Sequence, residues 1–217
     1  MRRRMIFADR TQAGQLLGER LAALHLVNPA VLALVRGGAP VGAPIAAILA
    51  APLDVVFVRK LGAPNQPELA VGAIADGSDP QIVLNDTLLA ALEIDADYVA
   101  ATAGQELAAI ERRRKAYQGV RPELDLTGRS VVVVDDGVAT GMTMQAALRQ
   151  VRRRHAGSVI AAVPVASAEA VAMLRREADD VVCLSAPRRF RSVDAHYRDF
   201  AQVSDEDVLA ILQAQAG

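Results

Sequence analysis

The chain has 217 residues, which is enough for one domain with a substantial buried core, and two independent domains would be cramped. Its 24 basic and 25 acidic residues give a formal net charge of −1, so no overall field draws nucleic acid or an anionic membrane to the surface. We therefore expect no nucleic-acid and no membrane partner, and any recognition of anions must be local.

The apolar residues indicate the class of core. Hydrophobic residues make up 52% of the chain but aromatic residues only 3%, so Ala, Val, Leu and Ile must fill an interior of the α/β kind. The longest apolar run, residues 41–53, is shorter than a membrane span. Asp9 and Arg10 interrupt the basic N-terminus before a signal peptide develops, so we expect a cytoplasmic protein. Cys183 is the single cysteine, which excludes an intrachain disulfide and favours a small buried side chain.

The first elements predict a β-α-β order. A helix capped by Asp9 has apolar residues at helical spacing as far as Leu24. It is followed by a short apolar strand, a helix of small residues and a second buried strand, at residues 30–35, 41–49 and 54–58. These segments have the lengths and spacing of a sheet protein with crossover helices.

The middle of the chain has a weaker pattern. Residues 59–68 are rich in Pro and Gly with few apolar anchors, which predicts a mobile loop. Two short strands, 71–75 and 81–84, flank Asp76-Gly77, a dipeptide favoured in hairpin turns. A long amphipathic helix is predicted from residue 95 to about residue 117, and the basic cluster in its last turns is interpreted as a solvated helix end.

The second half returns to alternating strands and helices. Residues 131–134 are four valines without alternation, as expected for a strand covered on both faces of a parallel sheet. The elements predicted after it are a helix, a strand, a helix begun by Ser167, a strand and a final helix, at residues 144–151, 159–163, 168–176, 181–184 and 205–213. Right-handed crossovers then give a doubly wound, mainly parallel α/β sheet with flanking helices, whose ligands bind beyond the carboxyl ends of the strands.

The most informative motif is the segment VVVVDDGVATGMT at residues 131–143. A loop of Gly, Ala and Thr at a helix N-terminus offers N–H groups and hydroxyls to a phosphate, and the helix dipole favours the anion. The adjacent carboxylates Asp135 and Asp136 can accept hydrogen bonds from a vicinal diol. Together these features would hold a ribose 5-phosphate at both ends, whereas the alternative is that the two acids only cap the next helix.

This segment resembles the signature of the type I phosphoribosyltransferases, in which apolar residues precede two acids and a small-Thr-Gly-x-Thr loop. The resemblance implies that Asp135 and Asp136 bind the ribose 2- and 3-hydroxyls. It also assigns the 5-phosphate to the loop that follows, with the substrate-binding residues Gly137, Ala139, Thr140, Gly141, Met142 and Thr143. Many members of the family have a second glycine where this chain has Met142.

Two further segments resemble the same family in position and order. Val35-Arg36-Gly37-Gly38, after the first strand, is similar to the loop that grips diphosphate through its main chain, often with a non-proline cis peptide. Arg59-Lys60, after the second strand, begins a segment that resembles the flexible catalytic loop. Lys60 and Lys115 are the only lysines in the chain. The resemblance thus adds Arg36, Gly37, Gly38 and Arg59 to the substrate-binding residues, and Lys60 joins Asp135 and Asp136 as catalytic.

Other phosphate-binding motifs do not fit. The glycines between Gly37 and Gly42 have the wrong spacing for a dinucleotide fingerprint, and Gly141 is followed by Met rather than by the Lys of a nucleoside-triphosphate loop. A receiver domain needs a lysine downstream of its acids, and none follows Lys115. His25 and His155 are interpreted as exposed helix-end residues without nearby ligands, so we expect no protein metal site.

The family resemblance also implies the domain plan. One phosphoribosyltransferase-like domain spans 1–217, with a core at about 28–184, a flexible loop or hairpin insertion, and a small hood from 185–200 and the terminal segments. The hood would cover the acceptor base, and an ordinary surface loop is an equal alternative for it. The whole chain is also similar to a bacterial group of stand-alone phosphoribosyltransferase-like proteins.

The expected reaction is transfer of the 5-phosphoribosyl group from 5-phosphoribosyl 1-diphosphate to a nitrogenous small-molecule acceptor, in the first instance a nucleobase. Mg²⁺ would be held mainly by substrate oxygens and water, so no protein ligand is named. Two alternatives stay open: a regulatory protein that binds phosphoribosyl diphosphate or a nucleotide without turnover, and a phosphoribosyl hydrolase. A homodimer is also left open.

Overall fold

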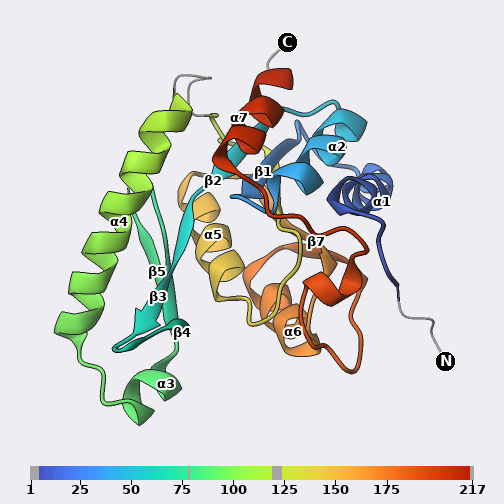
Figure 1. Cartoon of the computed structure of the whole chain (residues 1–217). Helices are drawn as coiled ribbons and strands as arrows, with labels where there is room; N and C mark the ends of the chain where they lie inside the picture. Colours follow the sequence, from blue (N-terminus) through green and yellow to red (C-terminus); the bar gives the residue numbers. More distant parts are fainter. Residues whose placement is uncertain (1–4, 78, 119–123, 216–217) are drawn as a thin grey trace.

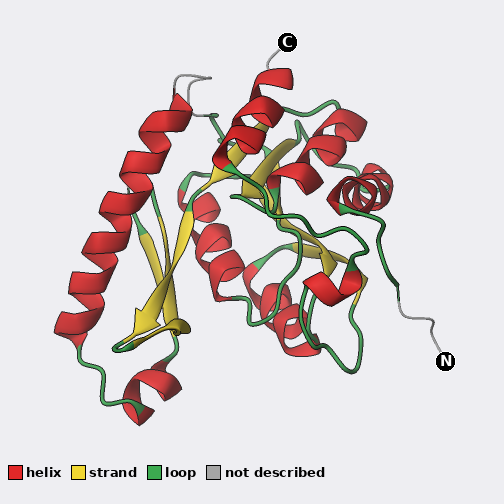
Figure 2. Ribbon diagram, in the orientation of Figure 1, coloured by secondary structure: helices red, strands yellow, loops and turns green. Residues whose placement is uncertain are grey.

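A five-stranded parallel sheet forms the centre of the computed structural model, which describes residues 5–77, 79–118 and 124–215 (Figures 1 and 2). Its strand order is β2-β1-β6-β7-β8. The strands are β1 (Ala30–Leu34), β2 (Leu53–Val56), β6 (Ser130–Val134), β7 (Ser158–Val165) and β8 (Asp180–Ser185). The predicted doubly wound parallel sheet is confirmed, while the predicted domain limits, residues 1 and 217, lie outside the described residues.

Helices cover both faces of this sheet. The helices are α1 (Arg10–Ala22), α2 (Ala39–Leu49), α5 (Met142–Arg153), α6 (Ala168–Glu177) and α7 (Asp205–Ala214). Alternate strand residues divide the core in two: Val31 and Val132 pack with α1, α2 and α7, whereas Leu32 and Val133 pack with α5 and α6. The valine run of β6 is fully buried because it lies between these two layers.

A second, antiparallel sheet of three strands lies beside the first, with the order β3-β4-β5. Its strands are β3 (Val58–Ala63), β4 (Gln66–Ala75) and β5 (Gln81–Leu84). The long helix α4 (Ala96–Gln118) runs alongside this sheet, and α5 packs against β4 and β5 from the other side (Figure 1). The predicted hairpin of residues 71–75 and 81–84 is confirmed, with Ala75 opposite Gln81.

Residues 59–68, predicted as an irregular loop, lie in the β3–β4 hairpin, so the expected hairpin insertion begins earlier than predicted. The mobility of this segment stays a prediction. Its turn lies at Pro64-Asn65, and Asn65 has a left-handed φ of 58°. Leu61 and Ala63 are buried in the main core, and β3 pairs along its length with β4. Pro and Gly composition indicated the turn correctly but missed the strands on either side of it.

Two other details differ from expectation. The short helix α3 (Asp86–Ala91), whose cap Asn85 accepts from the Leu88 N–H, was not predicted. In α4, Arg113 forms an ion pair with Asp205 at 3.4 Å, and Arg114 binds Asp76, so these residues fasten α4 to neighbouring elements. The interpretation of this basic cluster as a solvated helix end holds for Lys115, which is exposed and pairs with Glu111.

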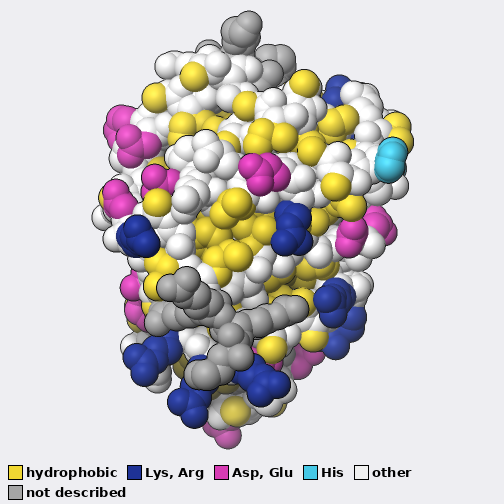
Figure 3. All heavy atoms as spheres, turned by 90° about the vertical axis from the view of Figure 1, so that its right-hand side faces the viewer, with side chains coloured by type: hydrophobic (Ala, Val, Ile, Leu, Met, Phe, Trp, Pro, Cys, Tyr) yellow, Lys and Arg dark blue, Asp and Glu magenta, His cyan; other side chains and the backbone are white. Residues whose placement is uncertain are grey.

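The face of the molecule over α1 carries both positive and negative side chains among apolar ones (Figure 3), as expected for a chain with a formal net charge of −1. No helix in the described part of the chain is both long and apolar enough to cross a membrane. Cys183, in β8, is only partly buried, and this burial raises the pKa of its thiol.

Candidate active site

The two predicted acids lie at the switch point of the sheet. From β1 the chain crosses over through α2 to β2, and from β6 it crosses through α5 on the opposite face to β7. Loops that follow β1 and β6 therefore diverge, and the crevice between them is where ligands bind in this class of sheet. Asp135 and Asp136 directly follow β6, and residues 35–38 directly follow β1.

The loop after β1 packs tightly against the acid pair. The Val35–Arg36 peptide bond is cis, as the family resemblance implied. A Cβ atom added to Gly37 would lie 2.1 Å from Oδ2 of Asp136, and one added to Gly38 would lie 2.6 Å from the carbonyl oxygens of Leu34 and Val134. Only glycine fits at either position, so the expected diphosphate loop and the acids form one unit.

The small-residue loop after the acids ends at the first turn of α5, as predicted. Gly141 is the N-cap of this helix with a φ of 93°. The Val138 N–H donates to the Val165 carbonyl at 2.9 Å, and the Ser167 hydroxyl donates to the Ala139 carbonyl at 2.8 Å. The loop is thus fastened to β7 and α6 while Ala139 and Thr140 are exposed. Since the first-turn N–H groups of a helix lack intrahelical partners, this arrangement suits an anion.

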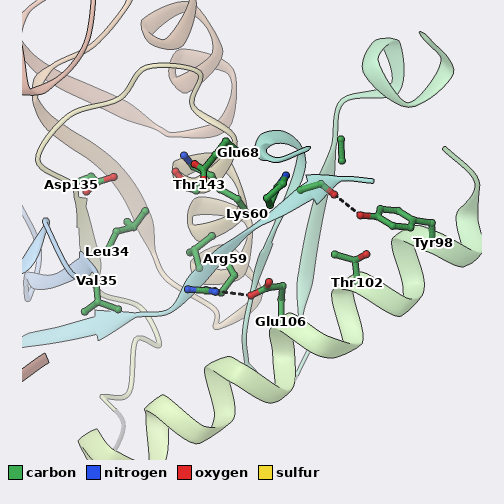
Figure 4. A pocket seen from close by; sticks show the side chains of 14 residues that line it. Leu34, Val35, Arg59, Lys60, Glu68, Tyr98, Thr102, Glu106, Asp135 and Thr143 are labelled. Carbon is green, nitrogen blue, oxygen red and sulfur yellow. Dashed lines mark hydrogen bonds and ion pairs between the residues drawn. The ribbon is translucent and has the colours of Figure 1, made fainter. Parts of the chain in front are cut away.

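A cleft of about 600 Å³ separates the acid pair from the β3–β4 hairpin and α4 (Figure 4). Asp135 and Thr143 line it from the main sheet side, and Arg59 and Lys60 line it from β3. Nε of Arg59 lies 2.6 Å from Oε2 of Glu106, which α4 contributes. The structure therefore brings Lys60, Arg59, Asp135 and Thr143 to one cavity.

The remaining predicted residues lie around this cleft rather than in its lining. The side chain of Asp136 does not line this cleft and instead contacts Arg10 of α1. The predicted substrate residues absent from the lining are Arg36, Gly37, Gly38, Gly137, Ala139, Thr140, Gly141 and Met142. Among them, Gly137 packs closely on Val193 of the hood segment, where an added Cβ would lie 2.5 Å from that side chain.

The two acids have different electrostatic surroundings. Burial raises the pKa of Asp135 well above its ordinary value, and the negative charge of Asp136 adds to this shift. Burial also raises the pKa of Asp136, but the hydrogen bond and charge of Arg10 oppose the shift. Lys60 contributes favourable charge to Asp135. Both carboxylates are therefore costly to ionise in the free protein and favour partners that donate hydrogen bonds.

Sequence reasoning missed Arg10 and did not single out Tyr197 as a contact of the acids. Nε of Arg10 lies 2.8 Å from Oδ2 of Asp136, and the Tyr197 hydroxyl donates to the Asp136 carbonyl at 2.6 Å. Arg10 lies 126 positions from Asp136 in the sequence, so no local pattern links them. In the segment 185–200, Tyr197 is buried against Phe7 and contacts Asp136. Whether this segment covers an acceptor base stays a prediction.

The described residues include no group of three or more His, Cys, Asp and Glu side chains that could hold a metal ion. His25 and His155 are exposed, as expected.

Comparisons with known proteins agree with this architecture. Residues 10–198 match the family model described as "Phosphoribosyl transferase domain". The chain is 45% identical over 207 residues to a Mycobacterium tuberculosis H37Rv protein named "Putative phosphoribosyl transferase Rv0571c", an alignment that covers 95% of this chain and 46% of that protein. The chain thus spans about half the length of the curated relatives it matches.

Solved structures give the same result. The protein TT1426 from Thermus thermophilus is 47% identical, has a TM-score of 0.83, and is matched over 98% of this chain and 100% of its own. The AQ2163 protein from Aquifex aeolicus, at 13% identity and a TM-score of 0.52 over 84% of this chain and 76% of its own, shares the fold. The acid pair and the small-residue loop follow one another as in the family signature, and the family model matches most of the chain. The chain belongs to the type I phosphoribosyltransferase family.

Proposed function

We propose that this protein transfers the 5-phosphoribosyl group from 5-phosphoribosyl 1-diphosphate to a nitrogenous acceptor, in the first instance a nucleobase, and releases diphosphate. The observation that carries the proposal is the convergence at the β1–β6 switch point. The acid pair, the small-residue loop before α5, the 35–38 loop and the β3 cations meet at this one edge of the sheet.

Each segment has a role in this proposal. Asp135 and Asp136 accept hydrogen bonds from the ribose hydroxyls, and the loop from Gly137 to Thr143 holds the 5-phosphate with N–H groups and hydroxyls. The loop of Arg36, Gly37 and Gly38 grips diphosphate. Arg59 and Lys60 supply positive charge across the cleft from Asp135.

In the chemical step the bond between C1 of the ribose and the diphosphate oxygen breaks, and its electron pair leaves with diphosphate. A bond forms between C1 and the acceptor nitrogen, which loses a proton. Orientation of the two reactants and preorganised charge are the sources of rate enhancement. Lys60 is the cation assigned to the leaving group, since it lines the same cavity as Asp135, whereas Arg59 in that cavity pairs with Glu106.

Mg²⁺ is part of the proposal, with the diphosphate oxygens and water as its main ligands. Mg²⁺ commonly keeps several waters beside substrate phosphates, which supports this choice of ligands. The ion would neutralise diphosphate charge when bound. A cytoplasmic location and a homodimer stay predictions of the sequence.

The test is incubation of the protein with phosphoribosyl diphosphate, Mg²⁺ and a library of purine, pyrimidine and pyridine bases, with diphosphate release and product mass measured. Acceptor-dependent release with a nucleotide product supports the transferase. Release without an acceptor would identify a hydrolase instead, and binding without release would identify a regulatory protein. The double variant Asp135→Asn, Asp136→Asn is the control that must lose the signal.

A further inference from the structure

Arg10, the first residue of α1, joins the acid pair to the hood. Its Nε donates to Oδ2 of Asp136 at 2.8 Å, and its NH1 group donates to the Ala201 carbonyl at 2.7 Å. The guanidinium also lies 3.8 Å from the centre of the Phe200 ring. The side chains of Arg10 and Asp136 are only 11% and 14% exposed, so this contact is largely removed from water.

The backbone around Asp136 is held by the same structure. Tyr197 donates to the Asp136 carbonyl, and burial raises the pKa of this tyrosine so that it stays a donor. The segment before Arg10 pairs with the hood, because the Phe7 N–H donates to the His196 carbonyl at 2.8 Å and the Arg198 N–H donates to the Phe7 carbonyl at 2.9 Å. Arg10 therefore starts its helix from a point that is fixed to the hood.

This geometry suits arginine. Two different nitrogens of one planar group donate to Asp136 and Ala201 while the group lies over a ring, whereas a lysine would have to reach both acceptors from a single nitrogen. A mostly buried carboxylate without a cation takes up a proton more readily. Arg10 opposes that tendency at Asp136, whereas the same charge acts on Asp135 from further away.

We propose that Arg10 is a positioning residue for the ribose, which holds the Asp136 carboxylate through Oδ2 and thereby presents its second oxygen, Oδ1, to a ribose hydroxyl. This inference rests on the proposed function. It also links occupation of the ribose site to the hood, since Arg10, Tyr197 and Phe200 belong to one contact network around Asp136. Asp135, on the other side, faces the cleft with Thr143.

The experiment measures ribose 5-phosphate binding by calorimetry between pH 5 and pH 8.5 for wild type, Arg10→Gln, Arg10→Lys and Arg20→Gln. The groups that face Asp136 are Arg10 from α1, Asp135 from the loop after β6 and Tyr197 from the segment 185–200. Removing the cation raises the pKa of Asp136 further, so the protonated form persists to higher pH. Arg10→Gln should therefore bind ribose 5-phosphate roughly tenfold more weakly than wild type near pH 6, as for loss of a charge-assisted hydrogen bond. Its affinity should approach that of wild type as pH rises.

The other variants complete the test. Arg10→Lys should restore the pH profile of wild type but only part of the affinity, and Arg20→Gln, exposed on the same helix, should match wild type. Carboxyl carbon NMR of Asp136 in wild type and Arg10→Gln should show the shifted titration without any ligand. If Arg10→Gln does not fold, the test uses Arg10→Lys, which should bind ribose 5-phosphate more weakly than wild type.

The outcomes separate this inference from the proposed function. Failure of wild type to bind ribose 5-phosphate at any pH would overturn the proposed function and the inference with it. Binding by wild type and equal binding by Arg10→Gln and Arg10→Lys would overturn the inference alone. Weaker binding by Arg10→Gln with an unchanged pH profile and unchanged Asp136 titration would also overturn the inference, because Arg10 would then have a purely structural role.

Discussion

At the scale of single residues, the two adjacent acids differ in what compensates their charge. Asp136 forms an ion pair with Arg10, whereas no ion pair among the described residues involves Asp135. The Oδ1 atom of Asp135 accepts only from the N–H of Asp136, at 2.9 Å, among the hydrogen bonds of the described part of the chain. Ionisation of Asp135 thus costs the free protein more stability than ionisation of Asp136 does.

We predict that Asp135→Asn raises the melting temperature at neutral pH while abolishing ribose binding. The pKa of Asp135 is raised in the folded state, so the unfolded chain loses its proton first as pH rises, and ionisation then favours unfolding. The asparagine keeps an oxygen to accept from the Asp136 N–H and carries no charge. Its advantage over wild type should be absent below about pH 4, the ordinary range for Asp, and should grow as pH rises above it.

The measurement is thermal unfolding of both proteins from pH 3.5 to pH 8. Asp207→Asn is a control of opposite sign, because hydrogen bonds from Ser204 lower the pKa of Asp207. That variant should be less stable than wild type near neutral pH, with the difference shrinking as pH falls through the lowered pKa. A lower melting temperature for Asp135→Asn at pH 7 would contradict the argument.

Gly141 is the residue on which the shape of the phosphate loop depends most directly. Its φ of 93° disfavours any side chain, and an added Cβ would lie 2.2 Å from Cε of Met173. We predict that Gly141→Ala destabilises the protein by about 1–2 kcal/mol from the backbone term alone, with a further loss from the contact with Met173. Denaturant unfolding of Gly141→Ala and of Gly141→Ala with Met173→Ala separates the two, because the second change removes the clash and leaves the backbone strain. Full recovery in the double variant would show that the conformation of Gly141 is unimportant.

At the scale of elements, the β3–β4 hairpin decides where the predicted catalytic lysine lies. Lys60 is exposed on β3 opposite Ala73 of β4, so a paired strand carries it. We predict that Lys60→Ala lowers turnover roughly a hundredfold, as for removal of one preorganised electrostatic group, and changes equilibrium binding of phosphoribosyl diphosphate much less. The cation interacts most strongly as charge builds on the leaving diphosphate.

Single-turnover diphosphate release and equilibrium binding in Mg²⁺ should be measured on the same variant. Lys115→Ala is the matched control, because Lys115 is exposed on α4 and pairs only with Glu111 among the described residues. Equal turnover of Lys60→Ala and wild type would reduce Lys60 to a surface lysine. Equal losses in binding and in turnover would place the role of Lys60 in substrate binding.

The elements also show what sequence patterns can and cannot predict. The valine run of β6 and the Asp-Asp-Gly segment after it were predictable because burial on both faces and a phosphate loop leave local signatures. The strands around the Pro64-Asn65 turn were not, since many residues of β3 and of the first half of β4 are polar or exposed and Leu61 and Ala63 are the buried residues of β3. Arg10 was not predictable as a site residue either, because its partner lies in another element and its position after Asp9 indicates only a helix start.

At the scale of the whole molecule, α5 connects the two sheets. Its buried residues Leu148 and Val151 pack on the parallel sheet, whereas Ala146 packs with Ala73 and Val83 of the antiparallel sheet. The small-residue loop ends at the first turn of α5, so a ligand bound there would contact the element that both sheets share. The hood is joined to the same region through Tyr197 and Asp136.

Because the ligand would bind only the folded chain, ribose 5-phosphate should raise the melting temperature of the whole protein. At one hundred times its dissociation constant a ligand adds about 2.7 kcal/mol, which corresponds to roughly 5–10 °C in a domain of this size.

Thr140→Val removes an exposed hydroxyl of the small-residue loop before α5 and replaces it with a methyl group of similar size. At the same ligand concentration its shift should be smaller by roughly 3–5 °C, as for the loss of about 1.4 kcal/mol of binding, while its melting temperature without ligand stays near that of wild type. Thr87→Val, at an exposed threonine of α3, is the control that should keep the full shift. An undiminished shift in Thr140→Val would show that the 5-phosphate does not bind at this loop.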